Sequence, residues 1–443
     1  MDIHDILSTD VINEANIVIE LQYLLCKLSE SNIEETFTYL NSTIFVKTKE
    51  KINQLAHNIL TILDNTIGKI DILFQLVRHL FQVLPNNLAD DFKFYFIHNF
   101  INHFASIKAK KHYVSSFARY TFIRLCCENK IIEIADIIKE IKYWVDYLPQ
   151  QETTHFALLM YFADYINQDA DLYEKMSKAI LNSTRTSFTN DALSAYSNFK
   201  EMEKQNKNFD NLIFLTKNYY PSDSILYYIK NDLLDEFCTC IAQKSNFNIL
   251  EYSPITFYEP HHILHNKISL IGFAAFYGSI KIFKHLLVEF NTNRYTIFQN
   301  EGRENKLTYL AICGGNFEII KLILHEREKA GKSPKYATLY YQNNIYDWLQ
   351  DNPTSEFSNI LHASCRVNNI KIFLDVLKQG CDVTQLHKGL APIHYAALNG
   401  HCDILRILLT LPYIDINCLT TDNVLYNKLF FYSSNSTTFS CFK

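Results

Sequence analysis

Near the C-terminus of this 443-residue chain, two short helical segments carry more apolar surface than one pair of helices can bury. Residues 391–409 read APIHYAALNGHCDILRILL. Pro392 suits the first turn of a helix, where its missing N–H would have no partner, and Gly400 suits a helix end with positive φ. The second segment has its apolar residues on one stripe: Ile404, Leu405, Leu408 and Leu409. Neighbouring copies of the unit must therefore cover this stripe.

Weaker copies precede this unit. Their helix-break residues, together with that of the last unit, lie 37, 53 and 32 residues apart: Gly278, Gly315, Asn368 and Gly400. The 53-residue gap is too long for one repeat, and within it residues 343–349 copy the second-helix entry at residues 368–373. We therefore count five repeats, of which the third is degenerate, and residues 224–243 have the rhythm of a sixth, capping unit.

The last unit resembles the ankyrin pattern TPLHxAAxxGHxxIVxxLL…DVN almost position by position, with Ala391 in place of the opening Thr. The layout is also similar to a large protist family of ankyrin proteins, which pair a divergent helical N-terminal half with irregular first repeats. The resemblance implies a stack of helical hairpins that binds partners. It also implies that His362 and His394, at the TPLH position, bond the loop backbone between repeats.

Residues 1–215 show helical periodicity without a motif that indicates an activity. Their short polar loops are typical of antiparallel helical arrays. Eight helices are expected at 12–29, 51–67, 71–84, 90–105, 113–127, 131–148, 154–166 and 170–181. Only ten Gly and nine Pro occur in the chain, which also favours long helices. The predicted fold is all-α, with a helical N-terminal bundle or solenoid followed by an ankyrin-repeat solenoid.

Four parts are expected along the chain: an all-helical N-terminal domain at 1–215, a capping or degenerate repeat at 224–250, ankyrin repeats at 251–417 and a truncated or irregular tail at 418–443. Residues 206–223 are the expected linker. No polar capping helix is apparent after Asn417. The last second helix should therefore be covered by this tail or stay partly exposed, and exposure would favour a homo-oligomer through the uncapped C-terminal repeat.

Charge and composition restrict the partners. The net charge is −5, with 42 basic and 47 acidic residues spread evenly, so no basic stripe predicts nucleic-acid binding. The apolar windows fall short of a membrane span, and residues 1–10 lack the features of a signal peptide. The eleven Cys lie within apolar helical patterns, as reduced thiols do. We therefore expect a cytoplasmic protein.

The sequence shows no pattern that predicts chemistry. His261, His262 and His265 lie within five residues, but a metal site would need a further Cys, Asp or Glu ligand nearby. The resemblance places this segment in a loop before the first clear repeat, so the three are interpreted as exposed loop histidines. Cys238 and Cys240 have no partner pair, so they are interpreted as structural. Phosphate-binding loops and nucleophile elbows do not occur. We expect no catalytic residue, no cofactor and no metal, and therefore no enzyme.

The first functional hypothesis is an intracellular protein-protein interaction scaffold or adaptor that binds another protein through the concave ankyrin surface. A ubiquitin-ligase substrate receptor, and an effector or enzyme with a catalytic helical N-terminal half, are the alternatives. Phe276 and Tyr277 are the expected aromatic anchors, because aromatic residues dominate interface energies. The full set of predicted protein-binding residues is Phe276, Tyr277, Arg366, Val367, His387, Lys388, Leu390, Leu398 and Asn399.

Overall fold

The structure is a computed structural model. It describes residues 3–101, 117–147, 152–181, 196–197, 199–201, 204, 210–243, 256, 258–265, 268–289, 306–323, 333–349, 357–416 and 418. Within these ranges the regular elements are helices joined by turns, and no strand is formed. The predicted all-α class is therefore confirmed.

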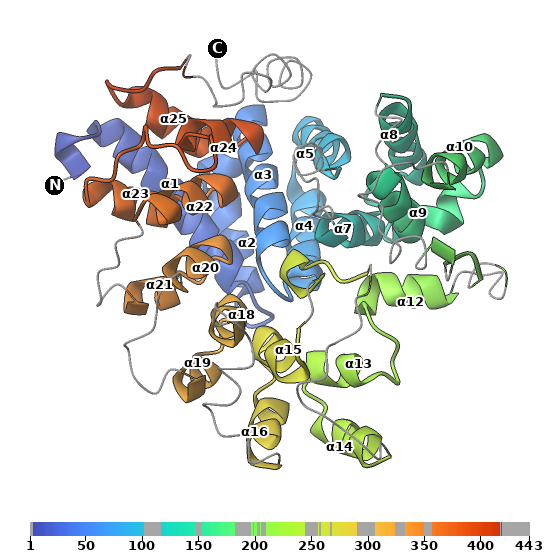
Figure 1. Ribbon diagram of the computed structural model, residues 1–443. Coiled ribbons are helices and arrows are strands. Elements are labelled where there is room, and N and C mark those ends of the chain that lie inside the picture. The colour runs from blue at the N-terminus through green and yellow to red at the C-terminus, as the bar shows by residue number, and fades with distance from the viewer. Residues whose placement is uncertain are drawn as a thin grey trace. The chain divides into compact units, whose positions relative to one another are not determined.

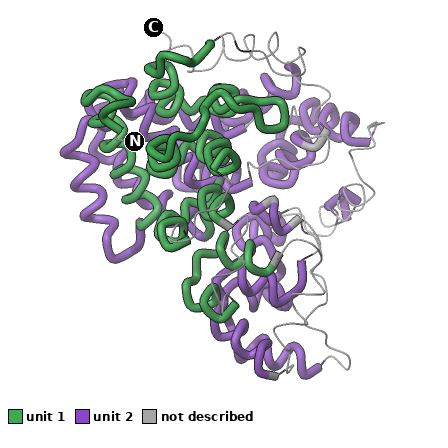
Figure 2. Tube along the Cα trace, turned by 60° about the vertical axis from the view of Figure 1, so that its left-hand side comes forward, with its two compact units in different colours: residues 1–27, 65–67, 292–443 green, residues 28–64, 68–291 purple. Residues whose placement is uncertain are grey.

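The chain forms two compact units, which Figure 2 colours separately. Unit 1 contains residues 1–27, 65–67 and 292–443, and unit 2 contains residues 28–64 and 68–291. Unit 1 thus combines the first helix of the chain with the C-terminal repeats. The expected domain boundary near residue 215 falls inside unit 2.

Unit 1 is built mainly from consecutive pairs of short helices (Figure 1). Each first helix packs against the next first helix, so that α18, α20, α22 and α24 form a continuous stack, and each second helix packs against its own first helix. The four helix pairs predicted for this part of the chain are present. The elements are η1 (Ile3–Asp5), α1 (Thr9–Lys27), α18 (Lys306–Gly314), α19 (Phe317–Ile323), α20 (Ser333–Leu339), α21 (Asn343–Leu349), α22 (Phe357–Val367), α23 (Ile370–Lys378), α24 (Pro392–Leu398) and α25 (Cys402–Thr410).

A residue with left-handed backbone separates the two helices of each pair. Gly315, Asn368 and Gly400 have φ of 76°, 57° and 67°, as their predicted role requires. The third repeat breaks at Tyr341, with φ of 54°, two residues before the Asn343 that the sequence copy had aligned with Asn368. That alignment was therefore wrong by two residues. The Tyr341 hydroxyl donates to the Val367 carbonyl, a contact that no local pattern indicates.

The long helix α1 packs against α23 and α25, the second helices of the last two repeats. Its buried residues recur on one face: Ile12, Ala15, Val18, Leu21, Gln22 and Leu25. The Gln22 amide bonds the break of the fourth repeat, because its Nε2 donates to Asn368 O (2.6 Å) and its Oε1 accepts from Ile370 N (3.3 Å). The expected helix at 12–29 is thus present as α1, and it belongs to unit 1 together with the C-terminal repeats.

The apolar stripe of the last second helix is covered. Ile404, Leu405 and Leu408 are buried, and α1 and α23 both lie against α25. Leu409 keeps 36% of its surface exposed. Most of the tail that was expected to cover this helix, residues 419–443, lies outside the described residues. Self-association through this repeat stays a prediction.

Unit 2 contains the other seven helices expected in the N-terminal half and two further helix pairs. Its elements are α2 (Ile33–Ser42), η2 (Ile44–Val46), α3 (Lys49–Asn65, all but its last residue), α4 (Ile70–Val83), α5 (Asn86–Asn99), α7 (Phe117–Glu128), α8 (Ile134–Tyr147), α9 (Glu152–Ile166), α10 (Ala170–Leu181), α12 (Asp210–Asn218), α13 (Ile225–Lys230), α14 (Leu234–Ala242), η3 (His262–His265), α15 (Leu270–Tyr277) and α16 (Ile280–Glu289). Helix α2 was not predicted, and α12 occupies the segment expected as a linker. Leu212 and Thr216 of α12 are buried, so this segment is part of the packed unit.

The last two helix pairs of unit 2 are the first repeats of the chain. Helix α13 packs against α15, and α14 against α16. The breaks are at Asp232 and Gly278, with φ of 50° and 70°. Asp232 also caps the following repeat, because its carboxylate accepts from the backbone N–H groups of Lys281 (3.2 Å) and Ile282 (3.1 Å). The unit predicted at 224–243 is therefore a helix pair stacked on the next one.

Candidate protein-binding surface

In three repeats of unit 1, the residue directly after the helix break bonds to the preceding repeat. Gln342 Nε2 donates to Cys313 O (3.2 Å) and Asn369 Nδ2 to Thr338 O (3.3 Å). His401 Nε2 donates to Arg366 O (2.8 Å). The accepting carbonyls lie at the ends of first helices, where no intrahelical donor remains. We call these bonds the inter-repeat ladder. Sequence reasoning missed it, although a polar residue after each break was a visible signal.

The two histidines at the TPLH position bond the backbone as predicted. His362 Nε2 contacts Gln385 O (2.9 Å) in the following loop, and its Nδ1 contacts Ser358 O (2.6 Å). His394 Nδ1 accepts from Ala391 N (2.9 Å), and its Nε2 donates to Cys418 O (2.9 Å). Burial lowers the pKa of His362. These imidazoles fix the loops that join consecutive repeats.

A tight hairpin projects between α23 and α24. His387 and Leu390 exchange two backbone hydrogen bonds, of 2.9 and 3.1 Å. Lys388 and Gly389, between them, have φ of 50° and 77°, the arrangement of a type I′ turn. Lys388 is exposed, and the preceding Leu386 has 45% of its surface exposed. The hairpin thus presents a cation and an apolar side chain to solvent.

Side chains from α22 and α24 adjoin this hairpin. The Tyr395 hydroxyl donates to His387 O (3.2 Å). Burial raises the pKa of Tyr395, and the nearby Arg366 opposes that rise. Burial, together with the charges of His362, Lys335 and Lys388, lowers the pKa of His387. We call this surface the hairpin face and define it by Arg366, Leu386, His387, Lys388, Tyr395, Leu398 and Asn399.

Five of the nine predicted binding residues lie on the hairpin face. Arg366 and Lys388 are exposed there, and the side chains of the other three are half-buried: His387, Leu398 and Asn399. Three more of the nine have between 0% and 4% of their surface exposed, so they are inaccessible to a partner in this structure: Phe276, Val367 and Leu390. Their burial removes them from the surface that we propose below.

Tyr277, the ninth predicted residue, belongs to a buried polar cluster in unit 2. Glu259 Oε2 accepts from the hydroxyls of Tyr220 and Tyr277, each at 2.6 Å. Glu259 Oε1 accepts from His261 N at 3.0 Å. Burial raises the pKa of Glu259 and lowers that of Lys230 to about 8. The cluster joins the first repeats to the loop before them.

The histidine cluster at residues 261–265, which includes η3, is not exposed at His261. This residue is buried, and its ring lies 5.1 Å from that of Phe276. The expectation of exposed histidines was therefore wrong at this position, whereas the side chains of His262 and His265 lie outside the described residues. Among the described residues, no group of three or more His, Cys, Asp or Glu side chains is arranged to bind a metal ion.

The cysteines form no paired cluster in the described part of the chain. Nine of them have free thiols. Cys238 Sγ lies 3.6 Å from His285 Nε2 on α16. The CxC segment thus packs one thiol on the neighbouring helix. In the described ranges, no helix combines the length and apolarity that a membrane span needs.

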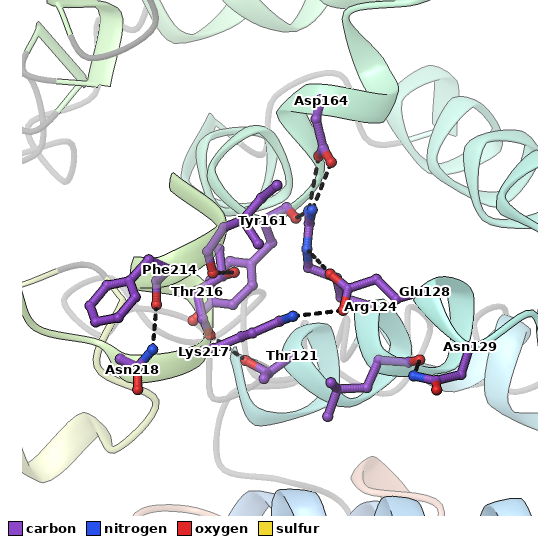
Figure 3. A network of polar contacts seen from close by, with 12 residues as sticks. Thr121, Arg124, Glu128, Asn129, Tyr161, Asp164, Phe214, Thr216, Lys217 and Asn218 are labelled. Atoms are coloured by element: carbon purple, nitrogen blue, oxygen red, sulfur yellow. Dashed lines mark hydrogen bonds and ion pairs between the residues drawn. The ribbon is translucent and has the colours of Figure 1, made fainter. Parts of the chain in front are cut away.

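A second polar network, around Arg124, holds α7, α9 and α12 together (Figure 3). Arg124 donates to both carboxylate oxygens of Asp164 (2.9 and 2.6 Å), to Tyr161 O (2.7 Å) and to Glu128 Oε1 (3.1 Å). Lys217 on α12 donates to the other oxygen of Glu128 at 2.7 Å. The guanidinium therefore joins α7 to α9, and Glu128 joins α7 to α12.

Stacked helix pairs with a hairpin between them define the C-terminal part as a helical repeat solenoid. Residues 330–420 match the family model of ankyrin repeats in three copies, which correspond to the pairs α20/α21, α22/α23 and α24/α25. Residues 330–420 are therefore ankyrin repeats. Repeats of this family generally mediate protein-protein interaction. Neither the curated proteins nor the solved structures contained a match to the chain.

Proposed function

We propose that this protein is an intracellular, cytoplasmic scaffold or adaptor that binds another protein through the hairpin face. The observation that carries the proposal is the hairpin itself. Its tip presents Lys388 and Leu386 to solvent, while the His362 imidazole holds its base through Gln385 O (2.9 Å). A preorganised tip loses little conformational entropy on binding, which favours affinity.

We also propose that the protein has no catalytic activity of its own. The buried carboxyl group of the polar cluster in unit 2 supports this view, because Glu259 is 1% exposed and the Tyr220 beside it is 4% exposed. A substrate would have to displace packed side chains to reach them. The role that we assign to this cluster is structural.

Affinity capture with the intact chain tests the binding proposal. The change is Leu386→Asp together with Tyr395→Ala on the hairpin face. The proteins that the unmodified chain captures are purified and tested for direct binding to it. We expect the variant to lose those that bind directly. Leu181→Asp, at a 63% exposed position in unit 2, is the matched control and should keep them. Partners that bind the hairpin variant with unchanged affinity would refute the proposed site.

A further inference from the structure

Charge is segregated between the two kinds of helix in unit 1. The first helices α18, α20, α22 and α24 contain no Asp or Glu at all. Each second helix contains one acidic residue: Glu318, Asp347, Asp375 and Asp403. Asp403 is buried, so the negative charge of the opposite side comes from Glu318, Asp347 and Asp375. The surface formed by the first helices lacks such charge.

Cations on the two sides differ in their pairing. Lys371, on second helix α23, lies 2.5 Å from Asp347 Oδ1 and 3.3 Å from Asp375 Oδ2. Arg366 and Lys388, on the hairpin face, take part in no ion pair with any acid of the described residues. The acid that precedes the hairpin, Asp382, accepts instead from the N–H and hydroxyl of Thr384. The charges of the hairpin face are thus available for a partner.

Arg366 and Tyr395 lie on the adjacent first helices α22 and α24. The Tyr395 hydroxyl donates to the carbonyl of His387, the residue before Lys388 (3.2 Å). An exposed apolar side chain, Leu386, adjoins them. The hairpin face therefore combines the positive charges of Arg366 and Lys388 with the aromatic ring of Tyr395 and the apolar side chain of Leu386.

We propose that the hairpin face binds an acidic segment of its partner protein, whose carboxylates meet Arg366 and Lys388 while an apolar side chain packs on Tyr395 and Leu386. This inference rests on the proposed protein-binding function. Guanidinium and carboxylate groups form paired, charge-assisted hydrogen bonds. A nucleic acid fits less well, because the chain has a net charge of −5 and the patch is short for a polyanion.

A peptide selection on the full-length chain tests the inference. A displayed library of random 12-residue peptides is selected for binding, and the enriched pool should be more acidic than the starting pool. The variant Arg366→Glu/Lys388→Glu should bind the selected peptides at least tenfold more weakly at low salt. Lys321→Glu/Lys378→Glu changes the net charge equally at exposed positions of second helices, and should bind them as the unmodified chain does. Binding should also weaken as salt rises.

The possible failures are distinct. Neutral or basic selected peptides, or acidic ones that bind both charge variants alike, would overturn the acidic partner and leave the protein-binding function intact. Stronger binding to a twelve-nucleotide single-stranded DNA than to any selected peptide would overturn it in favour of a nucleic acid. If no peptide is enriched and the hairpin variant keeps all captured proteins, both proposals fail.

Discussion

Arg124 shows how one buried charge can organise three helices. Burial alone lowers the pKa of its guanidinium, but the hydrogen bonds and charge of Asp164 outweigh burial and raise it. The side chain is 2% exposed, so solvent screens the pair very little. Removing one partner would leave the other charged and buried, which is the costly situation for an ion pair.

We predict that Arg124→Met lowers the free energy of unfolding of the chain by about 3 to 5 kcal/mol. The reason is that Asp164 and the Tyr161 carbonyl then lose their donor. Denaturant unfolding followed by circular dichroism measures the change. Arg78→Met, at an exposed position of α4, is the matched control and should stay within about 0.5 kcal/mol of the unmodified chain.

The double variant Arg124→Met/Asp164→Leu sharpens this test. It removes both charges together, and it should recover a large part of the lost stability because no buried charge remains unpaired. If Arg124→Met alone costs less than about 1 kcal/mol, the network contributes little to stability and our account of it is wrong.

At the scale of the helix pair, local chemistry could be predicted and tertiary contacts could not. Gly315, Asn368 and Gly400 adopt positive φ because Gly and Asn do so at low cost, and the sequence indicated all three. Tyr341 and Asp232 adopt it as well. Neither was indicated, because their conformations depend on bonds to neighbouring repeats: Tyr341 to Val367 O, and Asp232 to the start of α16.

The ankyrin resemblance placed His387 and Lys388 at the binding surface, and both lie on the hairpin face. The burial of other side chains was not predicted. Phe276 was expected at the surface because aromatic residues favour interfaces, but its ring packs on His261 in the preceding loop. The sequence pattern does not show which elements cover a first helix. The exposed Leu386 and the half-buried Tyr395 were missed for the same reason.

We predict that Gly315→Ala is more destabilising than Gly68→Ala, although both residues have nearly the same φ, of 76° and 69°. A Cβ at Gly68 meets no atom within 4 Å, so only backbone strain of about 1 kcal/mol is expected there. A Cβ at Gly315 would lie 2.5 Å from Gln342 Oε1, so it would displace the amide that bonds Cys313 O. The excess cost should be about 0.5 to 1.5 kcal/mol in thermal or denaturant unfolding.

Removing the Gln342 side chain isolates this cause. In a Gln342→Ala background the clash and the ladder bond are both absent, so Gly315→Ala should cost no more than Gly68→Ala does. An excess that persists in this background would mean that the ladder bond is not what Gly315 protects. The comparison is a double-mutant cycle over two adjoining residues.

At the scale of the whole chain, α1 belongs to a unit whose other described α-helices begin at residue 306. The amphipathic pattern of α1 predicts one buried face, but it cannot indicate which surface covers that face. The bonds from Gln22 to Asn368 and Ile370 show that α23 and its turn form part of the cover. Helix α1 thus takes the place that a further repeat would have beside the last two second helices.

We predict that Gln22→Ala speeds amide hydrogen exchange in α23 and α25 and leaves the exchange of α3 and α4 unchanged. The loss of two buried hydrogen bonds should lower the local opening free energy by about 1 to 3 kcal/mol. Hydrogen exchange read by mass spectrometry measures it. Tyr23→Ala, at a 50% exposed position of the same helix, is the control and should have no such effect.

Deletion of residues 1–27 extends the prediction to the assembly state. It exposes the apolar stripes of α23 and α25, so the truncated chain should self-associate more strongly than the full chain in light scattering. Unchanged exchange in both helices after the deletion would contradict the covering role of α1.

The position of Gln22 also has a consequence for biosynthesis. Its partner Ile370 follows 348 residues later, and a ribosome adding about 5 to 20 residues per second needs roughly 20 to 70 s to reach it. Throughout that interval the apolar face of α1 has been translated while its docking surface has not. The nascent chain must therefore keep this helix shielded, by a chaperone or by temporary contacts, until translation of the last repeats is complete.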